Sequence, residues 1–210
     1  MGTHPGRKRR RKLEAPSRRR VSAYLRGGLA SHSLVSEPFI LGLHSEVLSH
    51  GDGQISSGRY RDGPVRVRWK GRVVYVAPAA DSVPSLMTEF FDSVVKREGS
   101  DPVKAAGMAL LGLLKIHPFS QANGRTARAL ATYMLLSEGY VEKPLRNLEK
   151  YVDESLDQYY EALALSSTEN PGPWDTYFSR AANSVFRPPG SGASEGFLAL
   201  VGESFRKALR

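Results

Sequence analysis

Residues 103–136 read VKAAGMALLGLLKIHPFSQANGRTARALATYMLL, and the rest of the fold can be worked out from this stretch. Up to Ile116 it is apolar on nearly every side of a helix, which is typical of a helix at the centre of a bundle. Residues 125–136 have the same character. His117-Pro118 ends the first helix, because a residue before proline disfavours the helical conformation. The stretch predicts two buried helices joined by a short polar loop.

The loop leads into the start of the second helix, where backbone N–H groups have no helical acceptor. Such groups at the positive end of a helix dipole bind anions, and Gly124 lets a ligand approach the backbone closely. Arg125 and Arg128 share one face of this helix and supply guanidinium groups for phosphate. His117 stands at the mouth of the loop as a proton acceptor. The combination indicates phosphoryl or nucleotidyl transfer to a hydroxyl group.

The remaining pattern is mostly helical. Residues 65–76 differ, because valines alternate with basic residues around a Lys70-Gly71 turn, which predicts a β-hairpin. Its arginines place it at the surface. Asp101 and Pro102 are expected to begin the central helix as N-cap and first residue. The expected fold is an all-α bundle with one hairpin, and its other helices are expected over 38–48, 83–98, 145–165, 174–186 and 197–209.

The charge of the chain is concentrated at one end. The 210 residues carry a net charge of +9, of which residues 1–20 contribute +8. We expect a disordered basic tail over 1–20, one globular domain over 21–187, and a linker with an amphipathic C-terminal helix over 188–210. The chain has no cysteine, which excludes disulfides, thiolate metal sites and a cysteine nucleophile. The five histidines do not cluster like metal ligands, and His32, His44 and His50 are expected at the surface or in loops.

Two interpretations of the tail remain open. It is either a solvated arm or an electrostatic tether to nucleic acid or an anionic surface. No apolar run approaches the roughly 20 residues of a membrane span, and no signal-peptide pattern follows the basic block. The expected location is the cytoplasm, or another cell into which the protein is delivered as an effector.

The loop has the pattern His-x-Phe-x-x-Ala-Asn-Gly-Arg-x-x-Arg over residues 117–128, and this pattern resembles the signature of the Fic family, which shares its fold with the Doc toxins. The resemblance extends roughly from Phe39 to Phe186. It implies a Fic-type helical bundle with a β-hairpin flap. It also implies a protein adenylyltransferase that moves AMP from ATP to a Ser, Thr or Tyr hydroxyl of a target protein.

The resemblance assigns roles to individual residues. His117 would be the general base. If the chain has no inhibitory glutamate of its own, a separate antitoxin-like inhibitor would be a further partner. The flap would position the target by strand addition. The nucleotide would be bound by Asn123, Gly124, Arg125, Thr126 and Arg128, and the target would dock on Val65, Val67, Val74 and Val76.

Gln121 departs from the family pattern, which has Asp or Glu there to bind Mg²⁺. An amide has no charge, and Mg²⁺ prefers anionic oxygen ligands. Three interpretations are open: AMP transfer that is slower or needs more metal, transfer from another donor (UMP, phosphoryl or phosphocholine transfer), and nucleotide binding with little chemistry. The retained His117 argues against the last.

Glu195 has two interpretations as well. Residues 191–196 match an inhibitory pattern of the family, Ser/Thr-x-x-x-Glu-Gly/Asn, whose glutamate pairs with the arginine that corresponds to Arg128. The alternative is an ordinary helix start, with Ser191 or Ser194 as N-cap and Glu195 favoured by the helix dipole.

Overall fold

The computed structural model describes residues 15–48, 57–96, 100–143 and 147–190. Within these ranges the chain forms eight α-helices, one 3-10 turn and two small antiparallel sheets, so the expected helical bundle with a β-hairpin is confirmed. The helices are α1 (Ala15–Ala30), α2 (Glu37–Leu48), α3 (Val83–Val95), α4 (Pro102–Ile116), α5 (Asn123–Ser137), α6 (Leu148–Glu154), α7 (Leu156–Leu165) and α8 (Gly172–Val185). The strands are β1 (Arg66–Trp69), β2 (Arg72–Val76), β3 (Val141–Glu142) and β4 (Phe186–Arg187), and η1 covers Ala80–Ser82.

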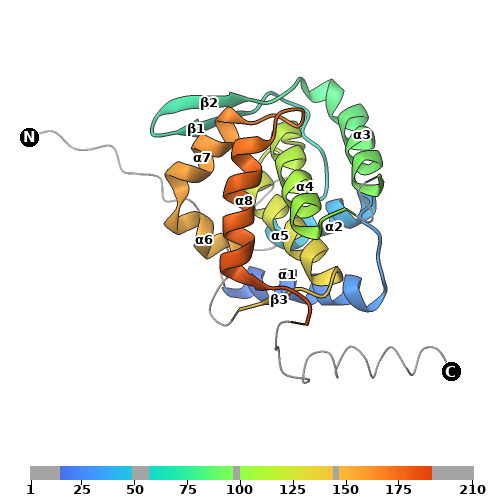
Figure 1. The fold of residues 1–210 in the computed structure, drawn as a ribbon. Helices are drawn as coiled ribbons and strands as arrows, with labels where there is room; N and C mark the ends of the chain where they lie inside the picture. The colour runs from blue at the N-terminus through green and yellow to red at the C-terminus, as the bar shows by residue number, and fades with distance from the viewer. Residues whose placement is uncertain (1–14, 49–56, 97–99, 144–146, 191–210) are drawn as a thin grey trace, which may run out of the picture.

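Helix α4 lies at the centre of the bundle, with α3, α5 and α8 packed around it (Figure 1). Every residue from Ala106 to Leu114 is buried, which explains why the sequence is apolar on all sides of this helix. Asp101 caps its start by accepting a hydrogen bond from the Lys104 N–H at 2.7 Å, with Pro102 in the first turn, as predicted. Close packing on all sides fixes the C-terminal end of α4, where the polar loop begins.

Helix α8 closes the bundle against a glycine of α4. The fully buried Trp174 donates its indole N–H to the Gly107 carbonyl at 2.8 Å. A Cβ atom at Gly107 would lie 2.6 Å from the Phe178 ring, so only glycine allows this approach. The buried indole thereby satisfies its polar atom while burying a large apolar surface.

The β1–β2 hairpin lies across the top of the bundle as drawn in Figure 1. Lys70 and Gly71 have positive φ angles of 49° and 82°, as a two-residue type I′ turn requires. A bulge interrupts the register between Val67 and Arg68. The sequence prediction of a surface hairpin turning at Lys70-Gly71 is confirmed.

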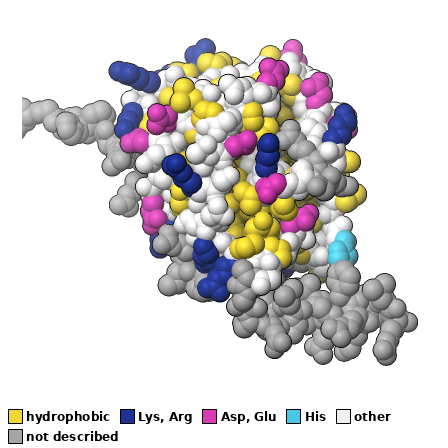
Figure 2. All heavy atoms as spheres, in the orientation of Figure 1, with side chains coloured by type: hydrophobic (Ala, Val, Ile, Leu, Met, Phe, Trp, Pro, Cys, Tyr) yellow, Lys and Arg dark blue, Asp and Glu magenta, His cyan; other side chains and the backbone are white. Residues whose placement is uncertain are grey.

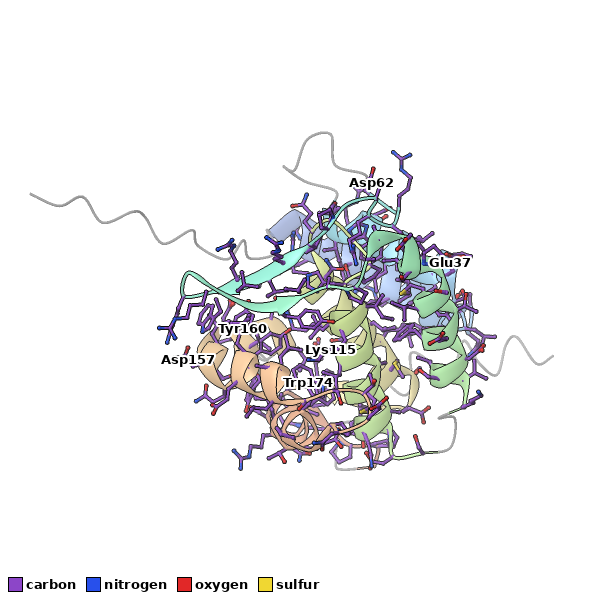
Figure 3. The ribbon with its side chains drawn as sticks, turned by 90° about the horizontal axis from the view of Figure 1, so that it is seen from above. Glu37, Asp62, Lys115, Asp157, Tyr160 and Trp174 are labelled. Carbon is purple, nitrogen blue, oxygen red and sulfur yellow. The ribbon has the colours of Figure 1, made fainter. Side chains whose placement is uncertain are left out.

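The hairpin is attached to the bundle at its tip and near its base. At the tip, the Trp69 ring stacks on Tyr160 of α7 with centroids 4.5 Å apart, and its indole N–H donates to Asp157 at 3.1 Å. Figure 3 shows Asp157 and Tyr160 close to the tip. Near the base, the Tyr75 hydroxyl donates to the Lys115 carbonyl, and the Lys115 ammonium lies 4.9 Å from the Tyr75 ring centroid. The hairpin therefore has a fixed position beside the C-terminal end of α4.

Three elements differ from the sequence predictions. Helix α1 begins at Ala15, inside the segment expected to be a tail, and it packs on the bundle through Val21 and Leu25. The helix expected over 145–165 is divided at Ser155, whose hydroxyl donates to the Tyr151 carbonyl at 2.7 Å and competes with the helical pattern. The β3–β4 pair has no counterpart in the predictions, because its two strands are only two residues long and far apart in sequence.

Several predictions fall outside the described residues. They concern residues 1–14, His50, the C-terminal helix over 197–209 and Glu195. Among the residues that the structure describes, no helix is long and apolar enough to cross a membrane.

Candidate active site

His117 follows the last residue of α4 in a left-handed conformation, with φ 54° and ψ 56°. Its Nδ1 lies 3.0 Å from the Leu114 carbonyl oxygen. A carbonyl oxygen only accepts hydrogen bonds, so Nδ1 carries the proton of the neutral ring and Nε2 keeps a lone pair. The backbone that turns the chain out of α4 thus also selects the tautomer that can act as a base at Nε2.

The surroundings of His117 keep its ring neutral. Burial lowers the pKa of His117 below its usual value near 6.5, and the positive charge of Arg61 acts in the same direction. The hydrogen bond to the Leu114 carbonyl opposes this shift and does not reverse it. The imidazole is therefore unprotonated at neutral pH, as a general base must be.

The loop that follows is held by Asn123. Its side-chain oxygen accepts the Phe119 N–H at 2.9 Å, and its side-chain nitrogen donates to the Phe119 carbonyl at 2.8 Å. The oxygen and the nitrogen of the Asn123 amide each make one of these bonds, and the nitrogen keeps a second N–H. The buried Phe119 ring anchors the same turn in the core.

Helix α5 begins without a side-chain cap. Its N-cap residue Ala122 is left-handed, with φ 61°, and the Thr126 N–H bonds back to the Ala122 carbonyl at 3.0 Å. The N–H groups of Asn123 and Gly124 precede this bond and have no helical acceptor. The helix start therefore has N–H groups without a helical acceptor, which can bind an anion. Thr126 itself is fully buried, and no partner for its hydroxyl is found among the described residues.

Arg128 is buried and oriented by Glu149. The Nε and one terminal nitrogen of its guanidinium pair with the two Glu149 oxygens at 2.7 and 2.8 Å. Burial acts to lower the pKa of Arg128, and the Glu149 carboxylate outweighs it, so the pKa is raised and the charge is permanent. The other terminal nitrogen lies where a Cβ atom at Gly124 would be 2.9 Å away. Glu149 thus leaves this nitrogen beside the first turn of α5.

The first motif arginine, Arg125, reaches the C-terminal end of α2, where its guanidinium lies 3.4 Å from the Val47 carbonyl. Arg125, Arg128 and Glu149 also line one cavity of about 340 Å³ between α1, α5 and the segment around β3. Both arginines therefore border this cavity beside α5.

His44 packs against the loop and is hydrogen-bonded to it. The ring is fully buried and stacks on Phe119 with centroids 3.7 Å apart and planes 5° from parallel. Its Nδ1 accepts the Gly58 N–H at 3.0 Å, so Nε2 carries the proton and donates to the Gln121 carbonyl at 3.3 Å. Burial lowers the pKa of His44 to about 4. The expectation of a surface or loop position was wrong for His44, whereas His32 is exposed as predicted.

Arg61 links the hairpin to His117. Its guanidinium donates to the carbonyls of His117, Gly63 and Pro78 at 2.8, 2.9 and 2.6 Å. Its backbone N–H also donates to the Pro118 carbonyl at 2.9 Å. The side chain is only 6% exposed, and it satisfies three carbonyls at the point where both hairpin ends meet the loop.

Most residues predicted for the site are close neighbours in the sequence. His117, Gln121, Asn123, Gly124, Arg125 and Arg128 lie in or beside one loop and helix start. The flap residues Val65, Val67 and Val74 are half-buried in or next to the hairpin, and Val76 is exposed. Sequence reasoning missed His44, Arg61 and Glu149. Only His44 had a local signal, since it lies beside Leu43 on the apolar face of α2.

Comparison with known proteins identifies the domain. Residues 34–135, from the turn before α2 to the end of α5, match the Fic/DOC family. This segment is a Fic/DOC family domain. The resemblance seen in the loop signature is thereby confirmed, and the bundle with its hairpin has the Fic-type fold.

Two relatives of the Fic/DOC domain have the same name. A "Protein adenylyltransferase Fic" from Nematostella vectensis is 28% identical over 143 residues, which are 67% of this chain and 31% of that protein. A protein of the same name from Aedes aegypti is 31% identical over 137 residues, 64% of this chain and 25% of that protein. The chain thus matches less than a third of either relative's length.

The fold of the Fic/DOC domain also has solved counterparts. A Fic-domain-containing signaling protein from Bacteroides thetaiotaomicron has a TM-score of 0.65 at 22% identity, covering 79% of this chain and 67% of that chain. This likeness establishes the fold.

Proposed function

We propose that the domain transfers AMP from ATP to a Ser, Thr or Tyr hydroxyl of a target protein, with His117 as the general base. The observation that carries this proposal is the 3.0 Å contact between Nδ1 of His117 and the Leu114 carbonyl oxygen, from which we infer that Nε2 has the lone pair. This base stands next to the uncapped start of α5. The relatives' name, protein adenylyltransferase, supports AMP as the transferred group.

Several residues of the loop and of the start of α5 take part in the proposed step. Nε2 of His117 takes the hydroxyl proton while the hydroxyl oxygen attacks the α-phosphorus of ATP. The bond from that phosphorus to the oxygen bridging to the β-phosphate breaks, and pyrophosphate leaves. The N–H groups of Asn123 and Gly124 and the charges of Arg125 and Arg128 stabilise the negative charge on the phosphates.

Among the described side chains, residue 121 offers Mg²⁺ no anionic oxygen. No group of three His, Cys, Asp or Glu side chains that could hold a metal ion is found among them. Gln121 contributes one neutral amide, and its buried nitrogen has no hydrogen-bond partner in the described part of the chain. A donor without an acceptor suits a phosphate oxygen better than a cation. Gln121 is therefore assigned here to direct contact with the nucleotide.

Gln121 also favours a second candidate, transfer of a different group by the same base. A UMP, phosphoryl or phosphocholine donor would use His117 and the α5 helix start unchanged. Intact-mass measurement of a modified target, with each donor supplied separately, distinguishes these groups by the mass they add. A mass increase only with ATP that equals one AMP supports the first candidate.

The assignment of His117 is tested by a matched pair of variants. His117 and His32 both have positive φ angles, 54° and 50°, and asparagine tolerates this conformation. We expect His117→Asn to lower labelling of protein by α-labelled ATP at least about 100-fold, since it removes the base. His32→Asn, a change at an exposed position, should label like the unaltered protein. Equal labelling by His117→Asn would contradict the general-base role.

A further inference from the structure

The two faces of the β1–β2 hairpin have different environments. Residues opposite each other in an antiparallel pair share a face, and the register joins Arg66 to Val76 and Arg68 to Val73. These four side chains form the outer face of the hairpin, and all of them are exposed. The opposite face, with Trp69 and Tyr75, packs on α7 and the end of α4.

The outer face is both cationic and apolar. Val73 and Val76 are 42% and 60% exposed, which places them among the most exposed large hydrophobic side chains of the described residues. Arg66 and Arg68 pair with no carboxylate in the described part of the chain, whereas Lys70 at the tip pairs with Asp157 at 2.9 Å. Figure 2 shows Lys and Arg side chains at the upper left, where Figure 1 places the hairpin.

The charge of the hairpin segment is strongly unbalanced. Residues 59–76 contain six basic residues and one acidic residue, Asp62. Arg61 is buried on three carbonyls and Lys70 is paired, so neither is available to a partner on the outer face. Arg66 and Arg68 therefore leave the outer face positively charged, and an anionic partner would complement this charge.

The hairpin is attached close to the proposed base. Arg61, five residues before β1, donates to the His117 carbonyl at 2.8 Å, and Tyr75 of β2 donates to the Lys115 carbonyl. The hairpin is thus tied to the chain on both sides of Ile116. The base of the hairpin, where Arg66 pairs with Val76, is therefore the part of the outer face closest along the chain to the contacts at His117.

We propose that the outer face of the hairpin binds an acidic segment of the acceptor protein. Carboxylates of this segment pair with Arg66 and Arg68, and an apolar side chain between them covers Val73 and Val76. A strand added to the hairpin edge places every second side chain on this face, which suits alternating acidic residues. The proposal names the substrate class and rests on the proposed function.

The test uses binding, which does not require catalysis. Three fluorescent acceptor peptides have the same sequence, with Glu, Gln or Lys at alternate positions around one Thr and one Val. Their affinities are measured by fluorescence anisotropy for the full chain, for Arg66→Glu/Arg68→Glu, and for Arg180→Glu. Arg180 is an exposed arginine on α8, away from the hairpin, and serves as the matched control.

The expected result is a reversal of charge preference. The unaltered chain should bind the Glu peptide about tenfold more tightly than the Gln peptide, with a preference that falls as salt is added. Arg66→Glu/Arg68→Glu should prefer the Lys peptide, which general damage to the fold cannot produce. Arg180→Glu should keep the original preference.

Three results would overturn the proposal. They are equal binding of the three peptides, no binding of any peptide, and the same loss of preference in Arg180→Glu as in the double variant. Tighter binding of an RNA oligonucleotide than of the Glu peptide, lost in the double variant, would assign the face to nucleic acid instead. A Glu peptide that binds but is not modified when ATP is added would support the proposed binding surface and contradict the proposed function.

Discussion

His44 joins two segments that the chain must hold together around the loop. Its ring accepts a hydrogen bond from Gly58 and donates one to Gln121, which is 77 residues away, and it stacks on Phe119. The Gly58 contact requires the neutral ring, because protonation of Nδ1 would place a second donor against the Gly58 N–H. The loop conformation is therefore coupled to the protonation state of one buried residue.

This coupling predicts acid sensitivity. The unfolded chain protonates residue 44 near pH 6.5 and the folded chain near pH 4, so between these values the unfolded state binds more protons. Stability should fall with decreasing pH in this window, by about 3 kcal/mol from this residue. Urea unfolding from pH 4 to 7.5 measures it. His44→Gln should be less stable at pH 7 and lose less stability on acidification, and parallel pH curves for both proteins would contradict the role.

Gln121 is the residue where the loop differs from the signature that it resembles. A carboxylate at this position would add the anionic oxygen that Mg²⁺ prefers. We expect Gln121→Glu to tighten Mg²⁺ binding in the presence of a non-hydrolysable ATP analogue by about tenfold or more, measured by titration calorimetry. Gln158→Glu, at an exposed position of α7, controls for added charge. Equal Mg²⁺ affinity in the two variants would show that residue 121 does not face the phosphates.

The residues that sequence analysis found and missed differ in how far their contacts reach along the chain. His117, Gly124 and Arg128 occupy fixed spacings within one loop and helix start, so the chemistry of the stretch is visible locally. The functions of His44 and Arg61 depend on carbonyls 77 and 56 residues away, which no local pattern records. Glu149 likewise gains its role only when α6 packs against α5.

At the scale of elements, the position of the β1–β2 hairpin on α7 is stabilised more by the Trp69–Tyr160 contact than by the Lys70–Asp157 ion pair. Asp157 and Lys70 are each 66% exposed, and exposed pairs contribute little. The Trp69–Tyr160 stack is the stronger restraint, by about 0.5–1.5 kcal/mol. We expect Trp69→Ala to raise hydrogen exchange of the β1 and β2 amides by about 2- to 12-fold, whereas Asp157→Asn has a smaller effect. Equal exchange in both variants would contradict this ranking.

Elements whose sequence has a regular spacing of apolar residues, a capping residue or a turn motif were predictable. The others were not. Helices α2, α3 and α4 begin or end at proline or a capping residue, and the hairpin turns at Lys70-Gly71. Helix α1 was missed because only Val21 and Leu25 of its apolar positions are fully buried amid many polar residues. The division at Ser155 was missed because a hydrogen bond from its hydroxyl to the Tyr151 carbonyl leaves the spacing of the apolar residues unchanged.

On the scale of the whole molecule, the site is assembled from three directions. The end of α4 supplies His117, the start of α5 supplies the anion site, and the segment leading into the hairpin locks both through Arg61. Because these parts are packed on the fixed helix α4, the geometry of the site belongs to the bundle. All of these parts come from residues 61–125, which lie well after the basic N-terminal segment in the sequence.

This separation predicts the effect of removing residues 1–14. They carry six of the Lys and Arg residues and one Glu, a net charge of +5, and α1 begins at the next residue. We expect deletion of 1–14 to leave ATP-dependent labelling unchanged and to weaken binding to duplex DNA, with a salt slope reduced by about 0.9 for each lost phosphate contact. Fluorescence anisotropy between 50 and 200 mM salt, on the order of physiological ionic strength, measures the slope. A variant with residues 7–12 changed to Gln separates charge from length, since it should behave like the deletion. Loss of labelling in either variant would show that the segment takes part in the reaction, and unchanged DNA binding would leave it as a solvated arm.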